Sequence, residues 1–525
     1  MATPTAAPID LSAALVLAPL PLADWLVVLP VALMIGFGAV LMMVRKSVRL
    51  HGIIAIAGLT LLVLLDAALL WRVAIHGPVT MVMGRWLPPF GIAFTADLFG
   101  AVMALVSALV ALAAGVFALR DIDAAGRRYG FFPFLMLLMA GVSGAFLTGD
   151  IFNLYVWFEV LLISSFGLLI LGSEPEQIDG ALKYAILNLV GTTLFLITVG
   201  YLYAIFGTLN MADIARKAAM LRDTAPLTTL TALFILAFAM KAAAFPVNFW
   251  LPASYHTPRV VVSALFGGLL TKVGIYSLVR VTVMLFAVER EELSFAVAVS
   301  AVLTMLVGAL GALAQSDLRR LVGYLVIAGI GNMLAGVAIG TPAAVSGAIL
   351  YALNSVVTMT ALYLVAGEAA RLGGAWSLAG LGGLWRQAPW LSGASLLLFL
   401  AAAGLPPVSG LWPKVMLLKA SLDIGAWWLA AAILVSAFLI TLALARVFLL
   451  AYWRPGSTPL NGTAPAGDWR IALPLGGLTA LVILFGLLPE PLFGLTQDAA
   501  AGLADPAAYI DSVFPSPAME RSAAR

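Results

Sequence analysis

The chain has 525 residues, of which 63% are hydrophobic and only 10% are Asp, Glu, Lys or Arg. Because soluble proteins average about 25% charged residues, this composition excludes a soluble fold and indicates an all-α integral membrane protein. The net charge of +3 is too small to indicate nucleic-acid binding, and a chain without cysteine has no disulfide or thiolate metal ligand. The three histidines, His51, His76 and His256, form no cluster, so we expect neither a metal site nor a cofactor.

A bilayer core about 30 Å thick requires about 20 apolar residues per helix. Fourteen segments meet this requirement, at residues 25–44, 52–71, 93–119, 131–148, 151–172, 180–207, 228–250, 260–286, 293–314, 321–340, 343–367, 390–421, 426–450 and 470–488. They form one predicted transmembrane domain, residues 25–488. The N-terminal segment 1–24 lacks the basic region of a signal peptide. The tail 489–525 is predicted to be solvated or in contact with partners, without a folded domain.

The distribution of Lys and Arg predicts the orientation of these spans. About fourteen lie in odd-numbered loops and about six in even-numbered loops. Because cytoplasmic loops carry the excess of basic residues, the odd loops are predicted to be cytoplasmic and both termini to lie outside. The longest even loop, 208–227, contains a polar, helix-forming stretch that is predicted to lie along the membrane surface.

Four ionisable residues fall deep within predicted spans. They are Glu159 in the fifth, Lys241 in the seventh, Lys272 in the eighth and Lys414 in the twelfth. An ionisable group at mid-bilayer costs about 2.5–3.5 kcal/mol on insertion scales and commonly marks an ion pathway. A purely structural pairing role is the alternative for each of them.

Three other charges have more ordinary interpretations. Lys419 and Arg280 lie near the ends of their spans, where a long side chain reaches the interface. Asp66 lies close to Arg72 on the second span, so an interfacial ion pair is at least as consistent with the sequence as a relay.

Prolines interrupt two of the spans that carry buried lysines. Pro246 leaves the carbonyl of Ala242 without a helical partner beside Lys241. Near Lys414, the same effect at Ala402, Ala403 and Ser409 is predicted from Pro406, Pro407 and Pro413. Two broken helices five spans apart predict two inverted five-helix repeats, at about 131–286 and about 293–450.

This arrangement predicts a proton gate that needs no cofactor. Burial favours the neutral form of an amine, whereas a nearby carboxylate favours the charged form. Movement of Glu159 relative to Lys241 would therefore switch the lysine between holding and releasing a proton. Candidates for carrying ordered water are Ser164, Ser165, His256, Thr271 and Tyr276, for each of which helix packing is the alternative role.

Several long motifs carry a family resemblance. GDIFNLYVWFEVLLISSFGLLILG, KAAAFPVNFWLPASY, SALFGGLLTKVGIYSLVR and GLPPVSGLWPKVMLLKA resemble the D subunit of Mrp-type cation/proton antiporters, which is related to the antiporter-like subunits of respiratory complex I. The resemblance covers about residues 80–450 and implies fourteen spans with two inverted repeats. It also implies a relay in which Glu159 pairs with Lys241, followed by Lys272 and Lys414, with Lys183 at a secondary position.

The chain departs from the family pattern at two places. Many relatives carry histidine and lysine in the eleventh span, where this chain has Tyr351, Asn354, Thr358 and Met359. The link from Lys272 to Lys414 is then expected to use water or neutral hydroxyls such as Thr358 and Thr360. The motif LPASY has Ala253 where the family often has aspartate.

We therefore predict a proton-translocating subunit of a multisubunit Na⁺ or K⁺/proton antiporter, a transporter and not an enzyme, in a bacterial inner membrane. Its expected partners are the other membrane subunits of the complex, protons, the exchanged cation and the lipid bilayer. The alternatives are an antiporter-like subunit of complex I or of a membrane-bound hydrogenase, a stand-alone solute carrier, and a structural subunit whose buried charges only hold helices together.

Overall fold

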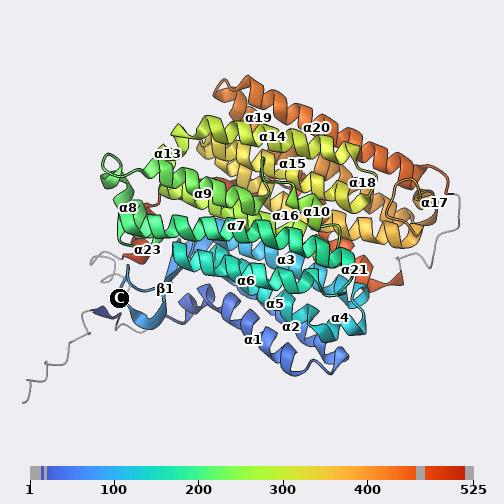
Figure 1. Ribbon diagram of the computed structural model, residues 1–525, viewed down its shortest axis with the longest axis horizontal. Coiled ribbons are helices and arrows are strands. Elements are labelled where there is room, and N and C mark those ends of the chain that lie inside the picture. The colour runs from blue at the N-terminus through green and yellow to red at the C-terminus, as the bar shows by residue number, and fades with distance from the viewer. Residues whose placement is uncertain (1–13, 17–20, 457–466, 515–525) are drawn as a thin grey trace, which may run out of the picture.

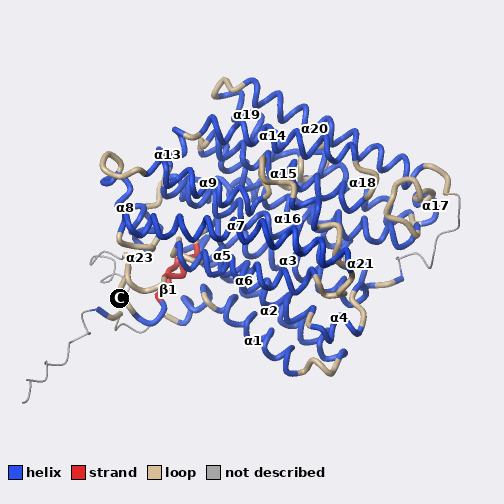
Figure 2. Tube along the Cα trace, in the orientation of Figure 1, coloured by secondary structure: helices blue, strands red, loops and turns tan. Residues whose placement is uncertain are grey.

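The computed structural model describes residues 14–16, 21–456 and 467–514. Over these residues the chain is a bundle of helices whose axes run in roughly one direction (Figure 1). A small sheet lies at one end of the bundle (Figure 2). Its two antiparallel strands are β1 (Val79–Val82) and β2 (Ala93–Ala96).

Within the described ranges, ten helices are long and apolar enough to cross a membrane. They are α2 (Val48–His76), α3 (Leu98–Asp121), α6 (Ile151–Leu169), α7 (Pro175–Phe206), α14 (Ser294–Ala314), α15 (Leu318–Ile339), α16 (Pro342–Gly373), α21 (Trp469–Leu487), α20 (Trp427–Val447) with η6 (Phe448–Trp453), and a helix composed of α11 (Val260–Leu265), η4 (Phe266–Leu270), α12 (Thr271–Val279) and η5 (Arg280–Leu285). The segments η4, η5 and η6 are π-helical.

The remaining helices are shorter. Four of them are apolar, namely α1 (Leu29–Met43), α5 (Phe131–Leu147), α9 (Leu227–Ala242) and α18 (Pro389–Ala403). The others are η2 (Leu22–Val27), η3 (Met83–Arg85), α4 (Ala124–Tyr129), α8 (Met211–Leu221), α10 (Trp250–Ser254), α13 (Ala287–Glu292), α17 (Leu384–Gln387), α19 (Leu411–Asp423), α22 (Glu490–Ala504) and α23 (Ala507–Val513).

Thirteen of the fourteen predicted spans coincide mainly with one of these helices, and the twelfth, 390–421, covers both α18 and α19. A count of fourteen crossings is not confirmed. The predicted breaks explain two of the short helices. The backbone turns left-handed at Ala243 (φ 60°) directly after α9 and at Gly404 (φ 81°) directly after α18. Pro246, Pro406 and Pro407 follow within these interruptions. Pro413 does not break a helix, because it lies in the first turn of α19, where a missing N–H has no helical acceptor.

The central helix of the bundle is α16. All of its most apolar stretch is buried, and it contacts α3, α11, α15, α18, α19, α21 and α22. The tail, which was predicted to be solvated or in contact with partners and without a folded domain, forms the helices α22 and α23. In α22, Thr496, Ala499, Ala500 and Leu503 follow helical spacing and are all buried, which gives this helix a small apolar face that packs on α16 and α3.

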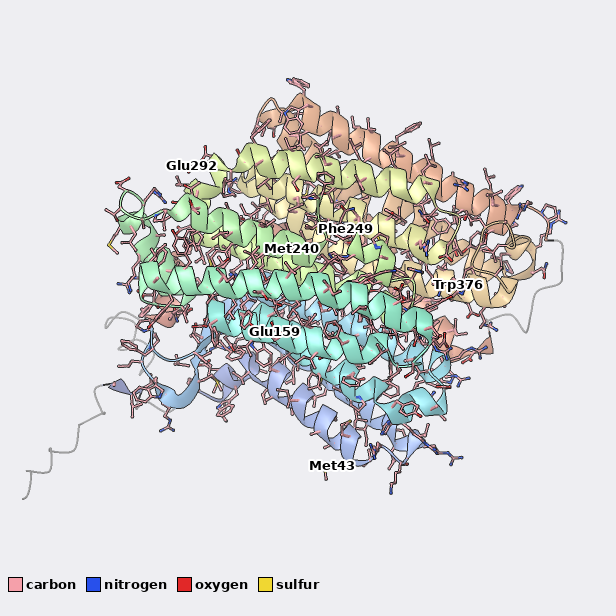
Figure 3. All side chains as sticks on the ribbon, viewed as in Figure 1. Met43, Glu159, Met240, Phe249, Glu292 and Trp376 are labelled. Atoms are coloured by element: carbon pink, nitrogen blue, oxygen red, sulfur yellow. The ribbon has the colours of Figure 1, made fainter. Side chains whose placement is uncertain are left out.

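The two ends of the bundle carry different loops. Helices α8, α13 and α23 lie at one end, and α4 and α17 lie at the other (Figure 1). Met43 and Trp376, beside odd-numbered loops, lie toward the α4 and α17 end, and Glu292 of an even loop lies at the opposite end (Figure 3). The helix predicted within 208–227 is confirmed as α8, and its position along the membrane surface stays a prediction.

Candidate functional site

Lys241 lies in the last turn of α9, beside the first helix break. Its side chain is 6% exposed, and its Nζ donates to the backbone carbonyl of Asn188 on α7 at 3.1 Å. The ring centroid of Phe158 on α6 lies 5.7 Å from the same nitrogen. No carboxylate among the described residues forms an ion pair with this lysine.

A small cavity adjoins Lys241. Its volume is about 20 Å³, and Tyr184, Asn188, Trp250 and Leu270 line it together with the lysine. This space is large enough for one water molecule. The indole Nε1 of Trp250 donates to the carbonyl of Met240 at 3.1 Å, so the chain after the break folds back over the end of α9.

Glu159 lies on α6, about midway along the bundle (Figure 3). It is half-buried, and the direct pair with Lys241 that the family resemblance implies is not present among the described residues. Phe152 and Ile163 are 41% and 63% exposed and share the helix face of Glu159 at i−7 and i+4. The carboxylate therefore lies on a face of α6 that this chain leaves partly uncovered.

Lys272 lies in the first turn of α12, two residues after the end of the π-helical segment η4. It is fully buried, and its Nζ donates to the carbonyl of Gly267 at 2.6 Å. Single-turn π-helical segments are frequent at functional sites. On the facing side, a Cβ at Gly268 would overlap Oγ1 of Thr360, so α16 approaches η4 closely. The hydroxyls of Thr271 and Ser355 are buried without a partner in this region of the described chain.

Lys414 lies on α19, just past the second break. Its Nζ donates to the carbonyls of Ala402 at 3.1 Å and Ala403 at 2.6 Å. These are two of the carbonyls that the prolines were predicted to leave without helical partners. The side chain is 7% exposed and has no ion-pair partner among the described residues.

Neutral groups occupy the region between Lys272 and Lys414. Asn354 Oδ1 accepts a hydrogen bond from Ser409 at 2.6 Å and another from Thr358 at 3.1 Å. Ser409 lies in the break between α18 and α19, and a cavity of about 10 Å³ adjoins it and Trp412. Sequence reasoning missed the Ser409 hydroxyl, although a serine within a broken helix opposite an intramembrane asparagine was a usable signal.

The secondary relay candidates lie elsewhere or have other partners. Lys183 is half-exposed and pairs with Asp179 at 2.5 Å, so the structure does not bring it to the buried lysines. His256 accepts from Arg320 at Nε2 (3.1 Å), and its Nδ1 therefore donates to the Pro252 carbonyl. Burial and the charges of Arg320 and Arg319 lower the pKa of His256.

The water-path candidates Ser165 and Tyr276 also have protein partners. Ser165 shares a hydrogen bond with Tyr184 at 2.9 Å, and the Tyr276 hydroxyl donates to the Phe146 carbonyl at 2.7 Å. Ser164 donates to the carbonyl of Val160 on its own helix.

Arg280 does not extend to the interface. It is 1% exposed and forms a two-pronged ion pair with Asp97, at 2.5 and 2.7 Å. Asp97 also caps α3 by accepting from the Gly100 N–H at 2.9 Å. The sequence interpretation of Arg280 is therefore wrong, because it did not identify Asp97 as a buried partner. Lys419, by contrast, is exposed and pairs with Asp423.

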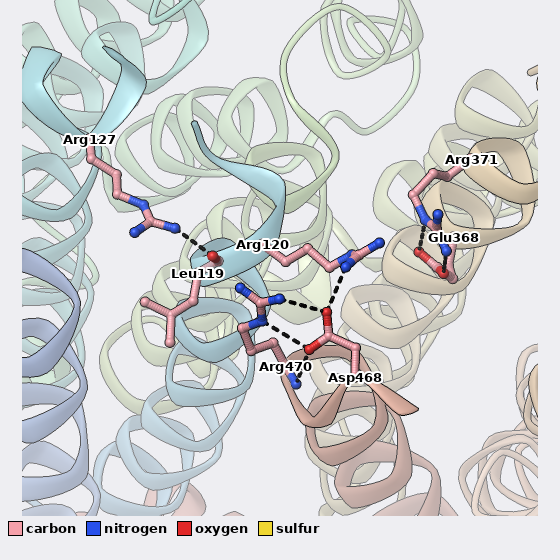
Figure 4. A network of polar contacts seen from close by, with 7 residues as sticks. All are labelled: Leu119, Arg120, Arg127, Glu368, Arg371, Asp468 and Arg470. Atoms are coloured by element: carbon pink, nitrogen blue, oxygen red, sulfur yellow. Dashed lines mark hydrogen bonds and ion pairs between the residues drawn. The ribbon is translucent and has the colours of Figure 1, made fainter. Parts of the chain in front are cut away.

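A polar cleft of about 800 Å³ opens at the end of the bundle that carries α4 and α17. Its charged lining residues are Arg120, Arg259, Arg319, Arg371, Arg470, Asp121, Glu174 and Glu368. Asp468 accepts from both Arg120 and Arg470, and Glu368 binds Arg371 through both oxygens (Figure 4). Hydrogen bonds from Arg470 and Arg120 hold the pKa of Asp468 well below its usual range.

Comparisons with known proteins agree on one family. Residues 148–441 match the family described as NADH:quinone oxidoreductase/Mrp antiporter, transmembrane. The D subunit of the Na(+)/H(+) antiporter of Alkalihalophilus pseudofirmus is 37% identical over 93% of this chain and 99% of its own length.

Two solved structures share the fold. One chain of the Mrp complex from Dietzia sp. DQ12-45-1b has a TM-score of 0.86 at 29% identity, covering 94% of this chain and 100% of its own length. A chain of the membrane-bound sulfane sulfur reductase, an archaeal respiratory membrane complex, also has a TM-score of 0.86, at 25% identity, covering 93% and 99%.

Proposed function

Because the chain belongs to the NADH:quinone oxidoreductase/Mrp antiporter transmembrane family, we propose that it is the proton-translocating subunit of a multisubunit Na⁺ or K⁺/proton antiporter. One observation carries this proposal. Lys241, Lys272 and Lys414 are buried, and their amines bond to backbone carbonyls. Intramembrane ionisable residues commonly mark proton pathways. An amine held only by carbonyls is able to give up a proton without leaving a buried anion unpaired.

In the proposed pathway, protons pass between Glu159 and Lys241, then to Lys272, and finally to Lys414. The water-sized cavity beside Lys241, which Leu270 also lines, supports the transfer from Lys241 toward Lys272. Asn354, Thr358 and Ser409 support the last, since their hydrogen bonds lie on the approach to the second break. Water completes the connections between these groups.

The uncovered position of Glu159 indicates a role for a partner subunit. A carboxylate at mid-membrane is costly in contact with lipid, so we infer that another membrane subunit covers the face formed by Phe152, Glu159 and Ile163. That subunit would control whether Glu159 approaches Lys241, and the isolated chain would be inactive.

The test is cation-dependent proton flux in vesicles that contain the full set of subunits. Glu159→Ala and Lys241→Ala are each expected to abolish exchange, because each removes one station of the relay. Lys419→Ala is the matched control, since this lysine is exposed and pairs with Asp423. Wild-type flux in an assembled complex with Lys241→Ala would overturn the proposal and leave the buried charges a structural role.

A second candidate function is a proton-pumping subunit of a redox-driven complex. A chain of the archaeal respiratory membrane complex has the same TM-score, 0.86, as the chain of the Mrp complex, and this similarity supports the second candidate. The chemistry within this chain would be the same, but electron transfer would drive it. Identification of the co-purified subunits by mass spectrometry separates the two: small hydrophobic membrane proteins support the antiporter, and iron–sulfur or flavin subunits support the redox complex.

A further inference from the structure

Asp66 is a buried carboxyl that the proposed relay does not use. It lies in α2 between Leu62 and Leu69 at helical spacing, and all three side chains are 0% exposed. Neither carboxyl oxygen has a hydrogen-bond partner among the described residues. The pair with Arg72 considered from the sequence is not formed, because Arg72 instead binds Asp24 of η2 at 3.2 Å.

The helices around Asp66 offer no compensating cation. The elements packed on α2 are α1, α3, α4, α5 and η2. Helices α1 and α5 contain no ionisable residue, and the ionisable residues of α3 are Arg120 and Asp121 at its far end. In α4, Arg127 donates to the carbonyls of Ile122 and Leu119 at that same end. Asp24 of η2 is already paired with Arg72.

The remaining titratable groups of α2 are distant along the helix. Arg49 and His51 lie near its first turn and His76 at its last residue, ten or more residues from Asp66 and therefore about 15 Å or more along the axis. Among the described residues, the carboxyl is thus enclosed by apolar helices without a counter-charge.

Two unpartnered hydroxyls lie at the depth of Asp66. Gly52 and Leu59 of α2 lie against Leu119 and Gly115 of α3, and this antiparallel register places Asp66 level with Ser107. The contacts of Gly100 with Phe146 and of Gly115 with Leu135 place Ser143 of α5 within about one helical turn of that level. Both hydroxyls are 1% exposed and lack a hydrogen-bond partner in the described structure.

We propose that Asp66 is a proton-binding site, separate from the lysine relay, that exchanges its proton for Na⁺ or K⁺. An isolated carboxylate in this apolar bundle is unfavourable, so the residue holds a proton as a neutral acid. It loses that proton only when a cation replaces it: COOH and M⁺ give COO⁻M⁺ and H⁺, one for one. A carboxylate oxygen is the kind of ligand that hard cations prefer, and Ser107 and Ser143 provide unpartnered hydroxyl oxygens near its level on two neighbouring helices.

This inference rests on the proposed antiport function, because it assigns a cation to the same subunit. Its test uses dicyclohexylcarbodiimide, which reacts with protonated carboxyls in apolar surroundings. The complete complex in membrane vesicles is labelled in choline, Na⁺ or K⁺ medium, and the modified residues are identified by mass spectrometry. Asp66 is expected to be labelled in choline, and a cation at ten times its Kd should lower the labelling about tenfold.

Two outcomes of this experiment overturn the inference. Absence of label at Asp66 in choline would show that it is not a neutral acid, and equal label in all three media would show that no cation replaces the proton. Asp423, which is exposed and paired with Lys419, is the control and should stay unlabelled.

Two variants separate this inference from the proposed relay. Asp66→Asn, which keeps the size and neutrality of the protonated residue, should preserve assembly while lowering flux and its dependence on cation concentration. Unchanged cation dependence in the assembled Asp66→Asn complex would contradict the inference. Glu159→Ala should abolish flux yet leave the cation-sensitive labelling of Asp66 intact, so a failed relay and a failed exchange site give different results.

Discussion

Removal of either partner of the Asp97–Arg280 ion pair should destabilise the protein strongly. Arg280 is 1% exposed, and its two terminal nitrogens lie 2.5 and 2.7 Å from the Asp97 oxygens. One of these nitrogens also donates to the Tyr276 hydroxyl at 2.7 Å. Either Asp97→Asn or Arg280→Gln leaves an uncompensated buried charge, which costs about 3–5 kcal/mol. The asparagine introduced by Asp97→Asn can still cap α3, so the loss reports the ion pair and not the cap.

The double variant makes the magnitude interpretable. Asp97→Asn with Arg280→Gln removes both charges, so its loss should be several kcal/mol smaller than the sum of the two single losses. Unfolding of the purified protein, followed by tryptophan fluorescence, measures all three. The exposed pair Asp179–Lys183, also at 2.5 Å, is the control and should change stability by about 0–1 kcal/mol. The argument that burial makes this pair strong would be refuted if each single variant lost less than about 1 kcal/mol of unfolding free energy and the double variant lost the sum of the two.

Three other parts of the chain lead to further predictions. A Cβ at Gly308 would overlap the backbone nitrogen of Ala328, so Gly308→Ala must separate α14 from α15 and should lower thermal stability by about 1–3 kcal/mol. Gly200→Ala is the control and should leave stability unchanged, because a Cβ there has no neighbour within 4 Å. Burial raises the pKa of Asp150 to about 6. Between about pH 4 and 6 the native state therefore binds more protons than the unfolded chain. The free energy of unfolding should fall by about 3 kcal/mol as the pH rises through this window. Asp150→Asn, which still accepts from the Asn153 N–H, should abolish that fall in a melting-temperature series, and an unchanged pH profile would contradict the assignment. Because the chain has no cysteine, Thr224→Cys and Lys46→Cys allow the orientation to be tested with an impermeant maleimide: Thr224→Cys should react from outside and Lys46→Cys from inside, and the reverse pattern would invert the topology.

The positions of the helices were predictable from the sequence because each depends on a local property. A span needs a continuous apolar stretch, and a proline removes a helical donor wherever it lies. This local logic located the interruptions after Ala242 and Ala403 and the surface helix α8. It failed at Pro413 because the same residue that breaks a helix interior is well tolerated in a first turn.

Contacts between distant segments were not predictable in the same way. Arg280 and Asp97 are 183 residues apart, and hydropathy does not indicate which charges meet inside a bundle. Glu159 illustrates the same limit, because residence in an apolar helix does not specify which face that helix turns inward. The packing of the tail was not predictable from its alanine-rich composition, because such a composition suits a solvated segment as well as a helix like α22 that approaches α16 closely.

Four of the buried cations among the described residues, namely Arg280, Lys241, Lys272 and Lys414, fall into two groups by the chemical nature of their partners. Arg280 faces a carboxylate, and neutralising either member would leave the other charge buried alone, which suits a permanent structural pair. Each of the three buried lysines instead donates to backbone carbonyls. For Lys272 and Lys414 these carbonyls lie at a π-helical segment and at a helix break, where regular helical bonding is interrupted. A carbonyl dipole stabilises the protonated amine and still accepts a hydrogen bond from the neutral one. Proton loss at these sites therefore strands no opposite charge, and this difference in partner is the physical reason for proposing transport at the lysines and a structural role for Arg280.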